Sequence, residues 1–435
     1  MTRSSLEDIR HSQVLKTLVV VLPLVCLLGF FAQNLWALPF VIGPYRLYTL
    51  AGEYYIFADM HCIVAACEGF RAGYDVFVDR PFDIFYRTHN YPIPWLLLTY
   101  LGVGFEHERL VAYLSIGAFL FSAFWVLRPR TWSIAVLSSL ALCSPGIILG
   151  IERANSDLVV FCFVALALAL LLREGGRSVI GAWFALFFAT ILKLYPAVAF
   201  VAFVRRCRDL RALLLVTGVT LAAGVAYTAL IWPDLSRTNV PKAEMFLSFG
   251  GAVYFRHMGF QAEIADFLSI AGGGVILLGA LWATLRTKTR LYFLSPKAAY
   301  GYLIGFSIIL FCFFLRSGYD YRHVFSLFMF PLFGEILSRT ELPRRFRLGF
   351  GLFVPVSLLV LLWSETVFID LTLFTLNRHP SDHEILTFFK YRHAYSWFVL
   401  PGIVTLGLIL VRDSLPPIPG LRPHPPRATA AAERA

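Results

Sequence analysis

Charged and polar side chains gather in one long interval near the N-terminus, residues 53–95, between two strongly apolar stretches. The interval carries Asp59, Asp75, Asp79 and Asp83, together with arginines and histidines. A bilayer does not accept so many charges, so we expect this interval to lie in water on one side of a membrane. A carboxylate placed there could act as a general base that takes a proton from an attacking hydroxyl group.

Later polar segments interrupt the apolar stretches and offer groups of complementary charge. They read GIERANSD at 150–157, LKLYP at 192–196, YFRH at 254–257 and RSGYDYRH at 316–323. Together they supply carboxylates, guanidinium groups, an ammonium group and imidazoles. This set suits an anionic phosphate leaving group held by cations beside a carboxylate base. For any single residue, ion pairing between helix ends is the competing interpretation.

Composition places these groups in a membrane protein. The chain has 435 residues, of which 58% are hydrophobic and 15% charged, and its mean hydropathy is +0.70. Soluble domains have roughly 45–50% apolar and about 25% charged residues. The net charge of +11 comes from short basic clusters between apolar runs, a pattern that sets membrane topology and does not indicate a nucleic-acid partner. The seven cysteines show no metal-ligand spacing.

The apolar stretches predict an all-α polytopic bundle with both ends in the cytoplasm. A cleaved signal peptide is the competing interpretation of the first stretch. Residues 91–104 are too short to span, so we expect an interfacial or re-entrant half-helix there. We expect about twelve transmembrane helices: 14–32, 110–127, 131–149, 156–172, 178–192, 194–204, 212–232, 263–286, 298–316, 320–338, 348–371 and 396–412.

This topology defines the domain organisation that we expect. Residues 1–412 form a single integral-membrane domain, in which 53–109 is an extracytoplasmic catalytic loop carrying short interfacial helices. The basic clusters, including those at 128–130 and 339–347, face the cytoplasm. Residues 413–435 are rich in proline and alanine and are expected to form a disordered cytoplasmic tail.

Several of these motifs, taken in order, resemble glycosyltransferase family 87. The first outer loop of that family has an aspartate, a Gly-x-x-Tyr-like turn and an Asn-Tyr-Pro-Pro element, and later elements read Glu-Arg-Gly-Asn-x-Asp, Lys-x-x-Pro and Asp-Tyr-Arg. The matching segments here are Asp59, EGFRAGYD at 68–75, Asn90-Tyr91-Pro92, ERANSD at 152–157, KLYP at 193–196 and DYR at 320–322. Two departures, Ile93 within the double proline and Ala154 in place of glycine, remove no charged group.

The resemblance implies the membrane glycosyltransferase C (GT-C) superfold and a sugar donor carried on polyprenyl phosphate. The best-known branch makes α-1,2-mannosyl linkages on phosphatidylinositol mannosides. We therefore expect a multi-pass enzyme of the inner or plasma membrane. It would move mannose to a lipid-linked or glycan acceptor on the extracytoplasmic face, among membrane lipids and without nucleic acid. The family's catalytic base maps onto Asp59.

As a mechanism, Asp59 removes the acceptor's proton, the oxygen attacks the anomeric carbon, and configuration inverts. Lipid phosphate is a good leaving group, so no general acid is required. No cofactor is expected, although a divalent metal stays open. We expect Arg322, His323 and Lys193 to hold the phosphate, and Arg153 either to do the same or to pair with Glu152. The remaining substrate-binding candidates are Asn155, Asn90, Tyr91, Asp320 and His257, the last of which packing also explains.

Two other function classes compete with this interpretation. A secondary transporter or a lipid or glycan flippase would place charges near mid-membrane and often repeats its halves. Here the charges cluster at helix ends, and the sequence shows no internal repeat. An O-antigen polymerase or ligase would share the donor chemistry.

Overall fold

The computed structural model describes residues 12–26, 49–50, 53–54, 56–207, 209–237, 248–314, 318–376 and 381–415. Across these residues the chain is almost entirely helical, and its two pairs of strands are each only two residues long. The predicted all-α fold class is therefore confirmed, and the chain is a polytopic membrane protein.

Within the described residues, 6 helices are long and apolar enough to cross a bilayer, or up to 7 if a bent pair counts as one span. The predicted count of about twelve is thus not confirmed. The six spans contain, in chain order, α4 (Glu108–Leu127), α9 (Leu210–Arg237), α11 (Ala262–Arg286), α12 (Pro296–Phe314), α15 (Val354–Leu376) and α16 (Asp382–Ser414). The short α14 (Arg344–Phe346) and the π-helix η5 (Arg347–Phe353) lead into α15.

Four of the predicted spans are apolar helices of only 10–17 residues. They are the helix over Ser12–Cys26, α7 (Ser156–Leu171), α8 (Gly176–Leu192) and the 3-10 helix η3 (Tyr195–Arg205). The end of the predicted first span, from residue 27 to 32, lies outside the described residues, as does the tail from residue 416. A 3-10 helix rises about 2.0 Å per residue, so η3 is roughly 22 Å long despite having few residues.

Two further predicted spans are broken at prolines, which corrects the prediction of straight helices there. The span 131–149 is divided into α5 (Trp132–Leu142) and α6 (Pro145–Glu152), which are bent by 54°. The span 320–338 consists of the 3-10 helix η4 (Asp320–Phe328) followed by α13 (Phe330–Ser338), which has Pro331 in its first turn. Proline lacks an N–H donor and clashes with the preceding turn, which favours it in the first turn of a helix, as in α6 and α13.

The polar N-terminal region folds into short helices. Strand β1 (Thr49–Leu50) pairs antiparallel with β2 (Glu53–Tyr54), and α3 (Ala58–Arg71) follows. An acidic residue in the first turn of α3 and a basic residue in its last turn both suit the helix dipole. The 3-10 helices η1 (Ile93–Leu101) and η2 (Phe105–His107) then lead into α4. Helix η1 begins after a proline, ends at Gly102 (φ 73°), and is too short to span a bilayer.

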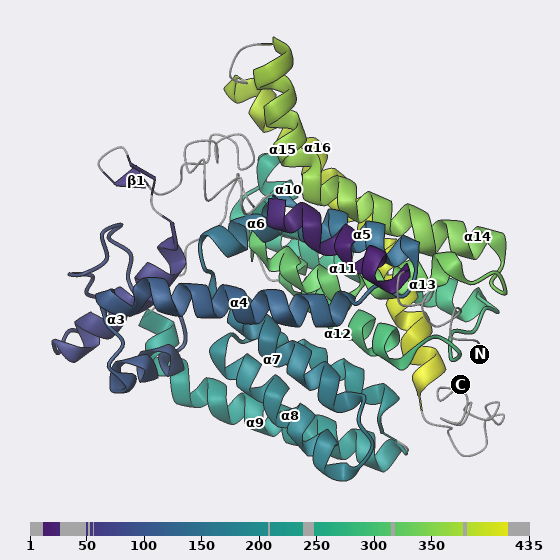
Figure 1. Ribbon diagram of the computed structural model, residues 1–435, viewed down its shortest axis with the longest axis horizontal. Coiled ribbons are helices and arrows are strands. Elements are labelled where there is room, and N and C mark those ends of the chain that lie inside the picture. Colours follow the sequence, from purple (N-terminus) through teal and green to yellow (C-terminus); the bar gives the residue numbers. More distant parts are fainter. Residues whose placement is uncertain are drawn as a thin grey trace.

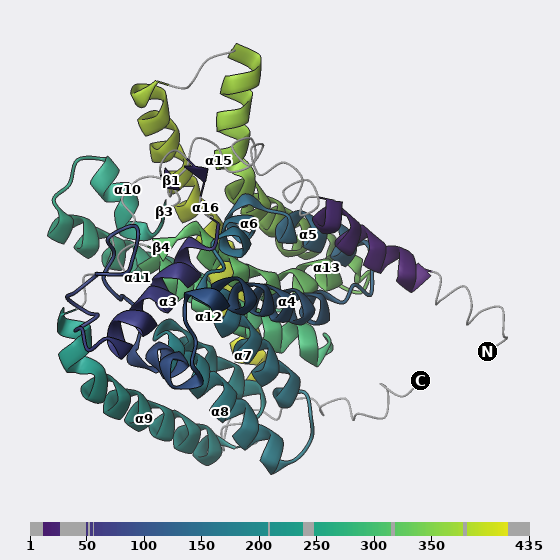
Figure 2. The same cartoon turned by 60° about the vertical axis from the view of Figure 1, so that its left-hand side comes forward.

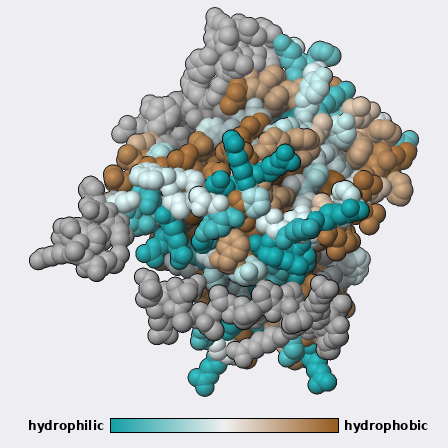
Figure 3. Space-filling view, turned by 90° about the vertical axis from the view of Figure 1, so that its right-hand side faces the viewer, coloured by the Kyte–Doolittle hydropathy of each residue, from teal (hydrophilic) through white to brown (hydrophobic). Residues whose placement is uncertain are grey.

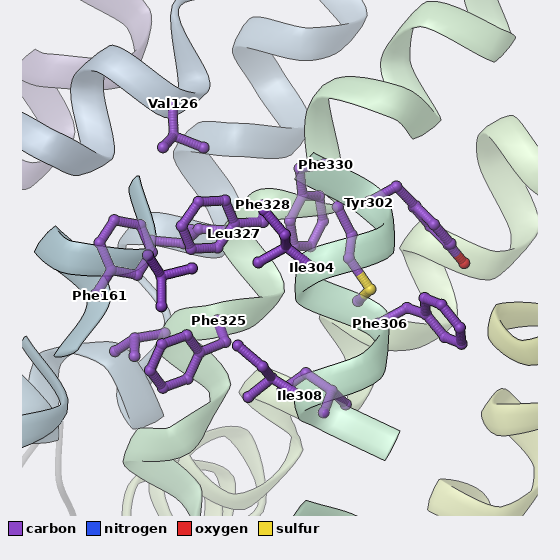
Figure 4. Packing of buried hydrophobic residues seen from close by; sticks show 14 of the residues in the cluster. Val126, Phe161, Tyr302, Ile304, Phe306, Ile308, Phe325, Leu327, Phe328 and Phe330 are labelled. Atoms are coloured by element: carbon purple, nitrogen blue, oxygen red, sulfur yellow. The ribbon is translucent and has the colours of Figure 1, made fainter. Parts of the chain in front are cut away.

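Close helix packing fixes η4 against its neighbours. An added Cβ at Gly301 or Gly305 of α12 would lie 2.9 or 2.8 Å from a backbone oxygen of η4, so only glycine allows these backbones to approach so closely. Figure 4 shows the aromatic side chains that fill the space beside this contact, where the ring of Phe161 lies 4.5 Å from that of Phe328. The second half of η4 is thereby held in a fixed place against α12.

Different short helices lie at the two ends of the helix bundle. Figures 1 and 2 show α3 beside the N-terminal end of α4, and α13 toward its other end. The α15–α16 pair projects from the body in both views. Strand β3 (Ser248–Phe249), which precedes α10 (Gly251–His257), pairs antiparallel with β4 (Gly318–Tyr319) immediately before η4.

Candidate active site

The first turn of α3 is docked onto the turn that joins α6 to α7. Phe57 caps the helix in a left-handed conformation (φ 63°), and its N–H donates to the Glu152 carbonyl at 2.9 Å. The N–H of Asp59 donates to the Arg153 carbonyl at 3.1 Å. These two backbone hydrogen bonds bring Asp59 next to residues that are more than ninety positions later in the chain. Asp59 is only 3% exposed, so it does not lie in open solvent as a loop aspartate would.

The Asp59 carboxylate is the centre of a buried network. Arg153 binds it in a bidentate way, with Nε donating to Oδ2 at 3.0 Å and Nη2 donating to Oδ1 at 2.6 Å. The Asn155 amide also donates to Oδ2. Arg87 Nη1 lies 3.6 Å from Oδ1, while its Nη2 donates to the Ala58 carbonyl. The sequence predicted that Arg153 would either bind phosphate or pair with Glu152. In the structure its guanidinium group binds Asp59 instead.

Opposing effects set the protonation state of Asp59. Burial alone would raise the pKa of its carboxyl group. The charge and hydrogen bonds of Arg153, the charge of Arg87 and the Asn155 hydrogen bond outweigh burial and leave that pKa below its ordinary value. Asp59 is therefore ionised at neutral pH, which a general base must be.

The turn between α6 and α7 explains how these groups converge. Ala154 adopts a left-handed conformation with φ 44°, which glycine adopts more readily than any other residue. This is the position at which the resembled family has glycine. Asn155 then caps α7, because its Oδ1 accepts the N–H of Asp157 at 2.8 Å. One side chain thus starts α7 and, through its amide nitrogen, holds the Asp59 carboxylate.

Lys193, at the end of α8, extends the network. Its ammonium group forms an ion pair with Asp157 and donates to Asn155 Oδ1 at 3.4 Å. It also lies 5.4 Å from the ring of Tyr91 and 5.8 Å from the ring of Tyr321. The structure therefore brings together five of the predicted site residues: Asp59, Arg153, Asn155, Lys193 and Tyr91.

Arg322 differs from the other two cations. Its guanidinium carbon lies 5.5 Å from the ring of Tyr195, and no acidic side chain among the described residues forms an ion pair with it. Its Nε has no hydrogen-bond partner. A Cβ at Gly318 would lie 2.6 Å from Arg322 Nη1, so glycine leaves room for this guanidinium group. The arrangement leaves a half-buried positive charge available to an anion.

Asp320 and His323 belong to a second buried cluster. Asp320 forms an ion pair with Arg392 of α16, whose Nη1 lies 3.6 Å from Glu365 Oε2. His323 lies 3.9 Å from Asp320 and packs on Phe249, with ring centroids 4.3 Å apart. Neither Arg392 nor Glu365 was predicted. Glu365 is a charged residue within a long apolar helix, and this placement was its available signal, whereas Arg392 lies in the polar first part of α16.

Two predicted substrate-binding residues remain, His257 and Asn90. The ring of His257 lies 5.1 Å from that of His393, centroid to centroid, and His393 follows Arg392 of the second cluster. Asn90 precedes Tyr91 and has an Oδ1 atom without a hydrogen-bond partner. Arg87, which sequence reasoning missed, had no spacing signal that set it apart from the other arginines of its loop.

The other loop aspartates have their own partners, and only Asp83 shares one, Arg87, with Asp59. Asp83 accepts from Arg87 Nε at 3.0 Å, Asp75 pairs with Arg237 at 2.6 Å, and Asp79 accepts the N–H of Asp75. Within the residues that the structure describes, no group of three or more His, Cys, Asp and Glu side chains is arranged to hold a metal ion.

Comparisons with known proteins give little support for a family. No protein-family model matches this chain, and no curated protein sequence matches it either. Among solved structures, the crystal structure of ArnT from Cupriavidus metallidurans in the apo state is similar over 91% of this chain and 78% of that chain. The sequence identity is 15% and the TM-score is 0.37.

Proposed function

We propose that this protein is a membrane glycosyltransferase of the GT-C type. It would move a sugar, with mannose as the first candidate, from a polyprenyl-phosphate donor to a lipid-linked or glycan acceptor on the extracytoplasmic face. The proposal rests on one observation: the half-buried guanidinium group of Arg322 has no acidic ion-pair partner in the described part of the chain. It lies over the ring of Tyr195, two residues after Lys193, whereas Asp59 is matched by Arg153 and Asp157 by Lys193.

The pairing of charges explains why Arg322 is assigned to the donor phosphate. Asp59 is matched by Arg153, and Asp157 is matched by Lys193. Arg322 is left over, and an arginine fork suits the oxygens of a phosphate group. Rings of tyrosine flank the same network: Tyr321 lies 5.7 Å from the Arg153 guanidinium carbon and 5.8 Å from Lys193 Nζ. Such rings could stack on a sugar.

The geometry also suggests which oxygen of Asp59 would act as the base. A carboxylate oxygen accepts about two hydrogen bonds. Oδ2 already accepts from Arg153 Nε and from Asn155. Oδ1 accepts one short bond from Arg153 Nη2, and Arg87 at 3.6 Å is too far for a second. Since the Asp59 side chain is only 5% exposed, an acceptor hydroxyl would reach Oδ1 only after Arg87 moves aside.

In the proposed reaction, Oδ1 of Asp59 takes the acceptor's proton as the acceptor oxygen bonds to the anomeric carbon. The bond between that carbon and the phosphate oxygen breaks with inversion of configuration, and Arg322 stabilises the charge of the departing lipid phosphate. A lowered pKa makes Asp59 a weak base, so proton transfer would come late, when the attacking hydroxyl has become acidic.

A secondary transporter or lipid flippase is the second candidate function. The observation that favours it is the buried cluster of Asp320, Glu365 and Arg392, because charges within apolar helices often mark transport pathways. An O-antigen polymerase or ligase would use the same donor chemistry as the main proposal and differ only in the acceptor.

The deciding experiment uses the purified protein in proteoliposomes that contain a membrane lipid extract as the source of acceptor, with polyprenyl-phosphate mannose, nucleotide mannose or no donor. Mass spectrometry of the lipid-linked glycans should show a product with one added sugar only in the first case. The Arg322→Ala variant should lose the product. Transfer from the nucleotide sugar without a lipid carrier would defeat the donor assignment. Movement of intact lipid between leaflets without any new glycosidic bond would favour the transporter.

A further inference from the structure

A pocket of about 360 Å³ opens at the other end of the helix bundle. It lies where α4 ends, α5 and α12 begin, and α13 ends. Helix α12 starts at this pocket and ends just before the strand that leads to Arg322. Its 19 residues rise about 1.5 Å each, so the pocket is separated from the candidate active site by roughly 28 Å. It is therefore a distinct site.

The pocket is lined by more positive charge than its own acidic residues neutralise. Arg128, Arg130, Lys297 and Arg339 line it, together with Glu335 and Glu341. Both acids lie near Arg339, Glu335 at 3.0 Å and Glu341 at 3.9 Å. Glu335 also accepts hydrogen bonds from the backbone and the hydroxyl of Ser295. Among the described residues, no acidic side chain forms an ion pair with Arg128, Arg130 or Lys297.

Lys297 is held in place on the wall of the pocket. Its ammonium group donates to the carbonyl of Trp125 and lies 4.4 Å from the centre of that indole ring. The side chain is half-buried. Basic residues at a cytoplasmic helix end ordinarily need only to be solvated, because their number sets topology. A half-buried lysine beside two arginines, around a hollow and without an acidic partner, is more costly unless an anion is present.

The surroundings place the mouth of the pocket at the level of lipid headgroups. Trp132 is 49% exposed and Tyr292 is 48% exposed, and such aromatic side chains gather at membrane interfaces. Figure 3 views the molecule from the side on which α13 lies in Figure 1, and hydrophilic side chains gather there between apolar flanks. The hydroxyl groups of Thr131 and Ser338 also lie on the pocket wall, where both are hydrogen-bonded to Ser133.

We infer that this pocket binds the phosphate group of an anionic membrane phospholipid, which its arginine and lysine side chains hold at the end of the bundle opposite the candidate active site. Phosphate oxygens suit guanidinium and ammonium donors. Basic pockets between transmembrane helices on the cytoplasmic side are a known form of lipid-headgroup site. Free phosphate offers the same chemistry without acyl chains, so the test must separate the two sources.

Native mass spectrometry of the delipidated full-length protein tests the inference. Phosphatidylglycerol, phosphatidylcholine and inorganic phosphate are titrated separately. The pocket variant is Arg128→Gln/Arg130→Gln, which changes two exposed side chains. The control is Arg344→Gln/Arg345→Gln, which removes the same charge from exposed positions at the start of α14, outside the pocket. A Lys297→Gln variant repeats the test at the half-buried position, and thermal unfolding checks that each variant is folded.

Phosphatidylglycerol should bind the parent protein more tightly than phosphatidylcholine does. Its binding should weaken at least about tenfold in the pocket variant and in Lys297→Gln, and much less in the control. Equal losses in the pocket and control variants would overturn the site, because they would reflect overall charge. Displacement of the lipid by inorganic phosphate at a comparable concentration would overturn the lipid assignment in favour of a soluble anion. None of these outcomes depends on glycosyl transfer.

Discussion

Two arginines of the candidate active site should respond to substitution in opposite ways. Replacing Arg153 by glutamine leaves the Asp59 carboxylate buried without its bidentate partner, and loss of one member of a buried ion pair costs about 3–5 kcal/mol. Replacing Arg322 by glutamine breaks no ion pair within the described residues, and its contact with Tyr195 contributes only about 0.5–2 kcal/mol. Arg153→Gln should therefore be mainly a stability variant and Arg322→Gln mainly a function variant.

The functional effect of Arg322→Gln follows from the charge-assisted hydrogen bonds that it removes. Such bonds contribute about 1.5–3 kcal/mol, and each 1.4 kcal/mol is a factor of about ten. With polyprenyl-phosphate mannose as donor, kcat/KM should fall roughly 10- to 150-fold while the thermal unfolding midpoint barely moves. Arg322→Lys, which keeps the charge but not the fork, should recover part of the rate.

Initial rates over a range of donor concentrations, paired with thermal unfolding of the same preparations in detergent, provide the measurement. The acceptor dependence serves as an internal control, because Arg322 is assigned to the donor only. The reasoning is refuted if Arg322→Gln shows the parental donor dependence. It is also refuted if that variant unfolds as early as Arg153→Gln, since Arg322 would then be a structural residue.

Asp59→Asn should lower turnover by about 10²–10⁴-fold at matched expression, whereas Asp79→Asn should be mild; near-parental turnover in a folded Asp59→Asn variant would exclude Asp59 as the base. Ala154→Gly should change stability by less than about 1 kcal/mol, because relief of about 1–2 kcal/mol of left-handed strain opposes a gain in unfolded-chain entropy; a large loss in thermal unfolding would contradict this account. Cysteines at Thr88 and Thr340 should be labelled by an impermeant reagent only from outside and only from inside, respectively, and labelling of both from outside would overturn the topology.

Local sequence signals predicted the helical class and much of the candidate site. Apolar stretches of about twenty residues correspond to α4, α9, α11 and α12, because in lipid the backbone must satisfy its own hydrogen bonds. Motif order brought Asp59, Asn155 and Lys193 into one hypothesis, and the structure places them in one network. These residues were detectable because polar groups interrupt otherwise apolar sequence.

Other features depend on contacts between residues that are far apart in the sequence. Residues 131–149 and 320–338 were each predicted to be one unbroken span. The position of a helix break depends on packing as well as on proline, and packing cannot be read from the sequence. The partner of Arg153 lies 94 positions away, and only the folded chain could choose Asp59 over the adjacent Glu152. Glu365 was passed over because a single charge in an apolar stretch was treated as part of the span 348–371, and Arg392 because it lay just before the predicted span 396–412.

The break between α6 and α7 determines where the start of α3, Asp59 and Asn155 lie. It exposes the carbonyls of Glu152 and Arg153, which accept the backbone N–H groups that begin α3. It needs a left-handed residue at Ala154, and that geometry turns Asn155 so that one face caps α7 and the other holds Asp59. A continuous helix here would satisfy those carbonyls internally and leave α3 without a dock. The proposed base is thus placed by an interruption of secondary structure, which is why the polar residues of 152–157 carry both the fold of this region and its proposed chemistry.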